Sequence, residues 1–261
     1  MLPQEVAIKI ERWMRMPSSQ ILWVEGPVST HCEEQLTNAA KHIVSLVLDA
    51  GIACVSFFGR PRLRRPNSTP ATGGDAGKPG RRRWEGPPPT PREATATALL
   101  YSVVAQLVHL LPGEFDCPAS PRFEEAFGAL DGSPASHPAA LDLVRAMLPL
   151  SPPTLVLVFD RLHLADGAAT RPVLGALVGL LRAHGAGTGR VVKVMFTTAG
   201  SCPLLAKTLE KGEKVDAGRM AQARLGQPLK GWSSSSGLGK RGKKNQKPVK
   251  KRGVRPPQSN S

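Results

Sequence analysis

The sequence predicts an α/β fold in which a parallel sheet forms the middle of three layers. Two runs, residues 155–160 and 191–197, are apolar almost without alternation, which is typical of strands covered by helices on both faces. Segments with helical periodicity separate the predicted strands, as the crossover connections of a parallel sheet require. The first run ends on Asp160, and ligands of such sheets bind beyond the carboxyl ends of the strands. We therefore expect functional side chains at that edge.

Residues 1–58 are predicted to form the first part of this domain. A short helix is expected at 5–15, and strands are expected at 21–25 and 52–58. Between the two strands, residues 33–50 place apolar side chains at helical spacing. The resulting strand–helix–strand unit is expected to be right-handed.

Residues 92–211 are predicted to complete the domain with alternating helices and strands. We expect the strand at 21–25 to lie beside the strand at 155–160 in a common parallel sheet. The other elements expected in this part are helices at 92–111, 138–148, 170–184 and 202–209 and a strand at 191–197.

Two segments are predicted to stay outside the domain because they lack hydrophobic periodicity. Residues 59–91 are rich in Arg, Pro and Gly and are expected to be a disordered insertion, whereas residues 212–261 are expected to be a disordered basic tail. Most of the net charge of +15 comes from them, because residues 60–92 carry +7 and residues 240–255 carry +9. The basic character of the chain therefore describes these segments and not the folded part.

Cysteine usage and hydropathy bound the cellular setting. The four cysteines form no C-x-x-C pair, and residues 1–10 carry charges where a secretory signal would need an apolar core. We therefore expect free thiols in a reducing compartment, and an intracellular protein of the nucleus or the cytoplasm. No apolar run approaches the roughly 20 residues that span a membrane, so no membrane association is expected.

The loop after the first strand has the layout of a phosphate-binding loop. The full motif is G-x-x-x-x-G-K-[ST] between a strand and a helix. Aligned on Gly26, the sequence has His31, Cys32 and Glu33 in place of the second glycine, the lysine and the hydroxyl. These changes remove the cation that binds phosphate and add a negative charge at the start of the helix. Thr30 and Glu33 also fit a capping box, so an ordinary capped helix is the alternative interpretation.

Five segments resemble the NACHT/STAND class of P-loop NTPase domains, especially the N-terminal ATPase modules of large fungal signalling proteins. Residues 21–26 and 53–58 resemble the first and second strands of that family, and residues 98–107 resemble the helix that follows. Residues 155–160 resemble its Walker B strand, and residues 192–198 resemble its sensor strand. The resemblance covers residues 1–210. It implies a vestigial nucleotide site in which Gly26, Ser29 and Thr30 face the phosphates and Asp160 holds Mg²⁺.

The sequence also departs from that family. The acidic residues expected soon after Asp160 are replaced by His163 and Leu164, and the arginine expected after the sensor strand is Ala199. Together with the missing lysine of the loop, these changes remove most of the charge that stabilises phosphoryl transfer. We therefore expect no catalysis and no bound cofactor.

The hypothesis that follows is a degenerate P-loop NTPase-like domain that acts as a non-catalytic binding or scaffold module for a protein partner that the sequence does not identify. One alternative is a residual ATP- or GTP-binding NTPase of the NACHT/STAND class that binds Mg²⁺ through Asp160. Another is a nuclear polyanion-binding protein that acts through its basic segments.

The basic run Lys240–Arg255 admits three interpretations. It fits a nuclear-import signal bound by an import receptor, a weak and non-specific nucleic-acid binder, or a solvated tail. No aromatic residue follows Trp232, so stacking on single-stranded nucleic acid is not expected. Binding through phosphates alone would weaken steeply with salt.

A metal site is a further alternative at the carboxyl edge of the sheet. The side chains that would form it are those of His31, Cys32, Asp160, His163 and Asp166. Their spacing matches no common metal motif. The simpler interpretation is a set of polar residues at the ends of strands.

Overall fold

The computed structural model describes residues 2–60, 88–112, 121–187 and 189–220, and it confirms the α/β fold. Five parallel strands form one sheet in the order β2-β3-β4-β1-β5. The strands are β1 (Gln20–Gly26), β2 (Ala53–Phe58), β3 (Thr154–Asp160), β4 (Val191–Ala199) and β5 (Lys214–Asp216). The α-helices are α1 (Gln4–Arg15), α2 (Thr30–Asp49), α3 (Pro91–Leu110), α4 (Pro121–Gly128), α5 (His137–Met147), α6 (Arg171–Gly187) and α7 (Pro203–Thr208).

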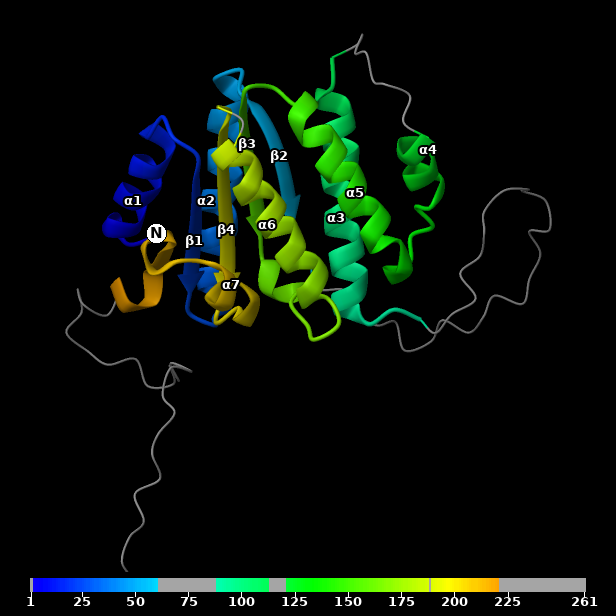
Figure 1. The fold of residues 1–261 in the computed structure, drawn as a ribbon. Helices are drawn as coiled ribbons and strands as arrows, with labels where there is room; N and C mark the ends of the chain where they lie inside the picture. The colour runs from blue at the N-terminus through cyan, green and yellow to red at the C-terminus, as the bar shows by residue number, and fades with distance from the viewer. Residues whose placement is uncertain (1, 61–87, 113–120, 188, 221–261) are drawn as a thin grey trace, which may run out of the picture. The chain divides into compact units, whose positions relative to one another are not determined.

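Helices cover both faces of the sheet, which gives the three layers that the sequence predicts. Helices α1 and α2 pack on one face, and their apolar side chains share a cluster with those of alternate residues of the strands. Helices α3, α5, α6 and α7 pack on the other face and form a second, larger cluster. In the view of Figure 1, α2 lies behind the sheet and α6 lies in front of it. No helix in the described ranges is both long enough and apolar enough to cross a membrane.

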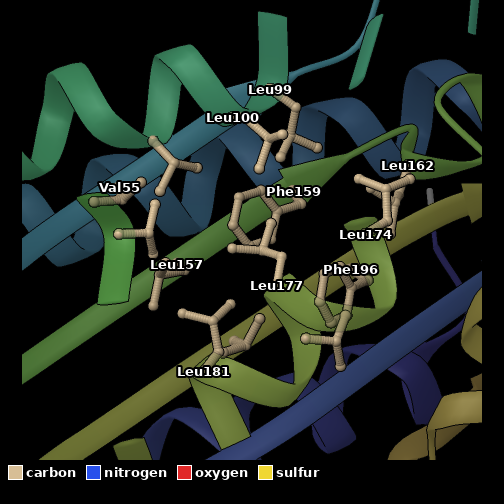
Figure 2. Packing of buried hydrophobic residues seen from close by; sticks show 14 of the residues in the cluster. Val55, Leu99, Leu100, Leu157, Phe159, Leu162, Leu174, Leu177, Leu181 and Phe196 are labelled. Atoms are coloured by element: carbon tan, nitrogen blue, oxygen red, sulfur yellow. The ribbon is translucent and has the colours of Figure 1, made fainter. Parts of the chain in front are cut away.

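The larger cluster is built on the apolar strand at 154–160. Figure 2 shows Phe159 of β3 beside Phe196 of β4, and the two rings are stacked with their centroids 5.4 Å apart. Leu177 of α6 and Leu100 of α3 close over them, and all four side chains are almost fully buried. Burial of each such side chain stabilises the fold by about 1.5–3 kcal/mol, so an unalternating strand belongs in the middle of the sheet.

The connections between strands define where a ligand site would lie. From β1 the chain crosses to β2 through α2 on one face, and it returns to β3, β4 and β5 along the other face. The connections that leave β1 and β4 therefore diverge, although the two strands are neighbours, with Gly26 paired to Ala199. A crevice between such strands at their carboxyl ends is the usual ligand position of an open α/β sheet.

Two predictions about the positions of strands in the sheet were wrong. Residues 21–25 and 155–160 share the parallel sheet, but β4 lies between them. Strand β2 lies at the edge of the sheet and most of its residues are only half-buried, although its apolar sequence suggested a buried strand. Both errors arise because a hydrophobic run carries no mark of the neighbouring strands, so it shows neither the pairing order nor an edge position.

Two predicted boundaries also need correction. Helix α2 begins at Thr30, three residues before the predicted start. The prediction that nothing packs after residue 211 was wrong for β5, which pairs with β1 through Trp23, Val24 and Glu25. Only Val215 of this short strand is buried, so it leaves almost no hydrophobic signal. Residues 61–87 of the predicted insertion at 59–91 and residues 221–261 of the predicted tail at 212–261 lie outside the described residues.

Candidate functional site

The candidate site lies where β1 ends and α2 begins. Only Pro27, Val28 and Ser29 separate the strand from the helix. Because α2 starts at Thr30, the positions of the second glycine and the lysine of a phosphate-binding loop fall inside its first turn. The connection is therefore a short turn, and it is shorter than a loop that wraps a phosphate.

Gly26 is required by packing against the helix. A β-carbon at residue 26 would lie 2.6 Å from Cys32 Sγ and 2.7 Å from Leu36 Cδ1, both far inside van der Waals contact. Cys32 is buried. Its burial is the larger of two causes that raise the pKa of its thiol, and the nearby negative charge of Glu33 is the smaller. At the position of the phosphate-binding lysine, the chain therefore has an uncharged packing group.

Ser29 is the N-cap of α2. Its hydroxyl accepts the N–H of Cys32 over 3.2 Å, while its carbonyl accepts the N–H of Glu33 over 2.9 Å. The predicted capping box of Thr30 and Glu33 was wrong by one residue, because Thr30 is already helical and exposed. The cap still uses an N–H group that a phosphate would need.

The turn is also tied to the end of β4. Gly200 donates its N–H to the carbonyl of Gly26 over 2.7 Å. Gly200 has φ +79°, and a β-carbon there would lie 2.5 Å from Val28 Cγ2. Val28 therefore lies directly against the backbone at Gly200, across the point where the crevice between β1 and β4 would open.

Asp160 lies at the end of β3 as predicted, but its carboxylate is enclosed by the chain. The residue is 1% exposed. The Thr37 hydroxyl of α2 donates to Oδ2 over 2.7 Å, and the Thr197 hydroxyl of β4 donates to Oδ1. A buried carboxylate needs such partners, because an unpaired one costs several kcal/mol.

Arg161 places a positive charge next to this carboxylate. Its Nη2 lies 3.7 Å from Glu33 Oε2, and its Nε lies 3.9 Å from Asp160 Oδ2. Arg161 has φ +58°, and it is the only non-glycine with positive φ in the described part of the chain. This left-handed conformation turns the chain just after β3, and the guanidinium lies between the two carboxylates of Glu33 and Asp160.

The candidate metal ligands are separated by different structural roles. His163 Nδ1 accepts the N–H of Ala199 over 3.3 Å, and burial lowers the pKa of this imidazole. Asp166 accepts the N–H of Leu204 over 3.1 Å at the start of α7, and the Arg171 Nε lies 2.7 Å from its other oxygen. Across the described ranges, no group of three or more His, Cys, Asp or Glu side chains is placed to hold a metal ion.

The start of helix α3 is capped by its own residues as well. Thr90 and Glu93 form a capping box in which each side chain bonds the other's backbone N–H. The backbone N–H and the hydroxyl of Thr90 both donate to the Glu93 carboxylate, and they lower the pKa of this group. One N–H group at the start of each of α2, α3 and α7 therefore bonds to a side chain, that of Ser29, Thr90 and Asp166 respectively.

Sequence analysis identified Asp160 but missed the residues that surround it. Thr37, Arg161 and Thr197 make the contacts, while Ser29 acts as a cap and Thr30 makes none of them. One signal was available for Thr37, because it lies four residues after Glu33 and therefore on the same side of α2.

We compared the chain with protein-family models, with characterised proteins and with solved structures, and none of the three comparisons found a match.

Proposed function

We propose that this chain is a degenerate P-loop NTPase-like domain that works as a non-catalytic binding or scaffold module. Three features support the proposal. The sheet is parallel and covered on both faces, a strand–turn–helix unit lies at the divergence between β1 and β4, and Asp160 ends a buried strand beside it. These are the positions where the NACHT/STAND resemblance implies a nucleotide and its magnesium.

The observation that carries the proposal is the position of Arg161. Its guanidinium lies between Glu33 and Asp160, where the resemblance implies a divalent cation. Both carboxylate oxygens of Asp160 already accept hydrogen bonds, one from the hydroxyl of Thr37 and one from the hydroxyl of Thr197. Mg²⁺ binds through one or two carboxylates in near-ideal octahedral geometry, and here two hydroxyls and a guanidinium already surround the Asp160 carboxylate. The residues present therefore do not fit a magnesium-linked nucleotide.

The phosphate side of the site supports the same conclusion. Cys32 replaces the lysine and is buried, and Glu33 adds a negative charge to the first turn of α2. Anions bind at helix starts because N–H groups and the helix dipole face them, and here the Cys32 N–H is bonded to Ser29. A triphosphate would meet no lysine in this turn, a carboxylate in the first turn of α2, and a helix start at which one N–H is already bonded.

Thermal unfolding of the purified full chain with Mg·ATP or Mg·GTP tests this proposal. A ligand at 100 times its Kd stabilises a protein by about 2.7 kcal/mol, which raises Tm by several degrees in a domain of this size. We expect no shift and no nucleotide turnover. Turnover that disappears in Asp160→Ala would overturn the proposal in favour of a residual NTPase, and saturable stabilisation without turnover would show that nucleotide binding survives.

A further inference from the structure

The outer edge of β2 carries an arrangement that the proposed function does not use. Strand β2 ends the sheet, and β3 is its only strand neighbour among the residues that the structure describes. Natural proteins protect such edges with charges or prolines, because the open backbone groups pair with other strands. The sequence of β2, Ala-Cys-Val-Ser-Phe-Phe, has neither a charge nor a proline. An uncharged six-residue segment without proline that contains Val55, Phe57 and Phe58 fits the pattern of self-associating segments, so this edge needs a cover.

Gln106 of α3 provides that cover. Its side-chain oxygen accepts the N–H of Ser56 over 2.8 Å, and its side-chain nitrogen donates to the carbonyl of Ser56 over 2.8 Å. One amide therefore bonds both backbone groups of a single residue. A neighbouring strand would supply the same donor and the same acceptor.

The helix holds Gln106 in this position. The side-chain nitrogen of Gln106 also lies 3.0 Å from the carbonyl of Ser102 and 2.8 Å from its hydroxyl, one turn earlier in α3. Leu107 and Val103, on the neighbouring face of the helix, are fully buried in the core. The cap is therefore held by hydrogen bonds within a helix that is packed into the core.

The direction of the backbone groups shows what the cap protects. Gly59 donates its N–H to the carbonyl of Asp160 over 3.0 Å, so alternate residues starting from Gly59 face β3. The peptide groups of Cys54, Ser56 and Phe58 face away from β3 by the same alternation. Gln106 bonds the middle of these three outward positions.

We propose that Gln106 is an edge cap that prevents β2 from pairing with β2 of a second copy of this chain. Two copies of this edge are self-complementary when they run antiparallel about a two-fold axis at Ser56. The two Ser56 residues then exchange their N–H and C=O groups, which is the hydrogen-bonded pair of an antiparallel ladder. Gln106 in each copy occupies these same groups, so pairing requires both amides to leave.

The test compares the mass of variants of the full chain by size-exclusion chromatography with light scattering over a range of concentrations. Wild type is expected to show no dimer through this edge, and Gln106→Ala is expected to form a dimer whose fraction rises with concentration. Val108→Ala changes an exposed position of the same helix and is the matched control, expected to behave as wild type. Adding Ser56→Pro to Gln106→Ala should abolish the dimer, because proline lacks the outward N–H.

Two results would overturn the proposal. One is a natively folded Gln106→Ala chain that associates no more than wild type, and the other is association that Ser56→Pro leaves unchanged. If Gln106→Ala does not fold, Gln106→Leu keeps most of the side-chain bulk, adds no charge and removes both the acceptor and the donor for Ser56, and it must then show the dimer. Hydrogen exchange of wild type gives an independent check, since the Ser56 amide is expected to be protected and exchange at the rate of an open edge contradicts the cap.

Discussion

Gly26 and Cys32 are in such close contact that a single methyl group on residue 26 would lie 2.6 Å from the Cys32 sulfur. In the sequence, these two residues mark the first glycine and the lysine position of a phosphate-binding loop. In the structure, they join the end of β1 to the first turn of α2. A glycine that suggests a phosphate cradle is here a packing residue.

Gly26→Ala tests this contact. The added β-carbon collides with Cys32 and Leu36, so we expect the free energy of unfolding to fall by about 1–3 kcal/mol, as for other overpacked sites. Urea unfolding measures the loss. Cys32→Ala removes the sulfur, so Gly26→Ala should be less harmful in that background. Equal losses in both backgrounds would show that the two residues are not coupled.

Thr37→Val tests the enclosure of Asp160. The change keeps the side-chain shape and removes a hydroxyl that donates to a buried carboxylate, so we expect a loss of about 1–3 kcal/mol in unfolding free energy. Thr30→Val, at an exposed position of the same helix, is the matched control and should change stability by no more than about 0.5 kcal/mol. Similar small effects of both variants would mean that Asp160 does not depend on Thr37.

Ser29→Ala and Thr30→Ala together identify the cap of α2. Loss of an N-cap hydroxyl costs about 0.5–2 kcal/mol, so Ser29→Ala should destabilise the chain by that amount. Thr30→Ala should be close to neutral, because Thr30 is helical and its hydroxyl is not the cap. Thermal unfolding of the two variants decides the assignment, and the reverse order of stabilities would restore the capping box predicted from the sequence.

Much of the fold could be predicted from the sequence, because burial leaves a direct signal. The unalternating run at β3 and the helical periodicity of α2 identify an α/β sheet covered on both faces. The order of the strands could not be predicted, since the hydrophobic run of a strand carries no mark of the strand that lies beside it. The three residues of β5 were missed because only Val215 among them is buried, so the segment leaves almost no hydrophobic signal.

Only two positions of the candidate site, Gly26 and Asp160, could be placed from the sequence. Both lie at strand ends, where the sequence pattern has meaning. The contacts that define the site come from Thr37, Arg161 and Thr197, which lie on three different elements. Only the packing of α2 across the sheet brings the hydroxyl of Thr37 to Asp160, and no spacing along the chain encodes that distance.

Stability should depend on pH through three imidazoles, of which His137 and His184 are buried and His163 is half-buried. Burial lowers the pKa of His137, His163 and His184 below the ordinary value of 6.5. Below pH 6.5 the unfolded chain therefore binds more protons than the folded chain, so the free energy of unfolding is greatest above that pH and falls as the pH drops below it. Urea unfolding at pH 7.5 and at pH 5.5 measures the difference. His163→Asn should reduce this difference, and stability that stays constant or rises on acidification would contradict the account.

The most direct test of the claim that no nucleotide binds at the carboxyl ends of the strands follows the backbone amides of the turn between β1 and α2. In ¹H–¹⁵N spectra of the full chain, the amide signals of Val28, Ser29 and Thr30 report on the groups that would cradle a phosphate. We predict that millimolar Mg·ATP leaves these three signals unchanged, because the Cys32 N–H is already bonded to Ser29, Val28 lies against Gly200, and Glu33 places a negative charge at the start of α2. Saturable shifts of these amides that Asp160→Asn weakens would contradict the account.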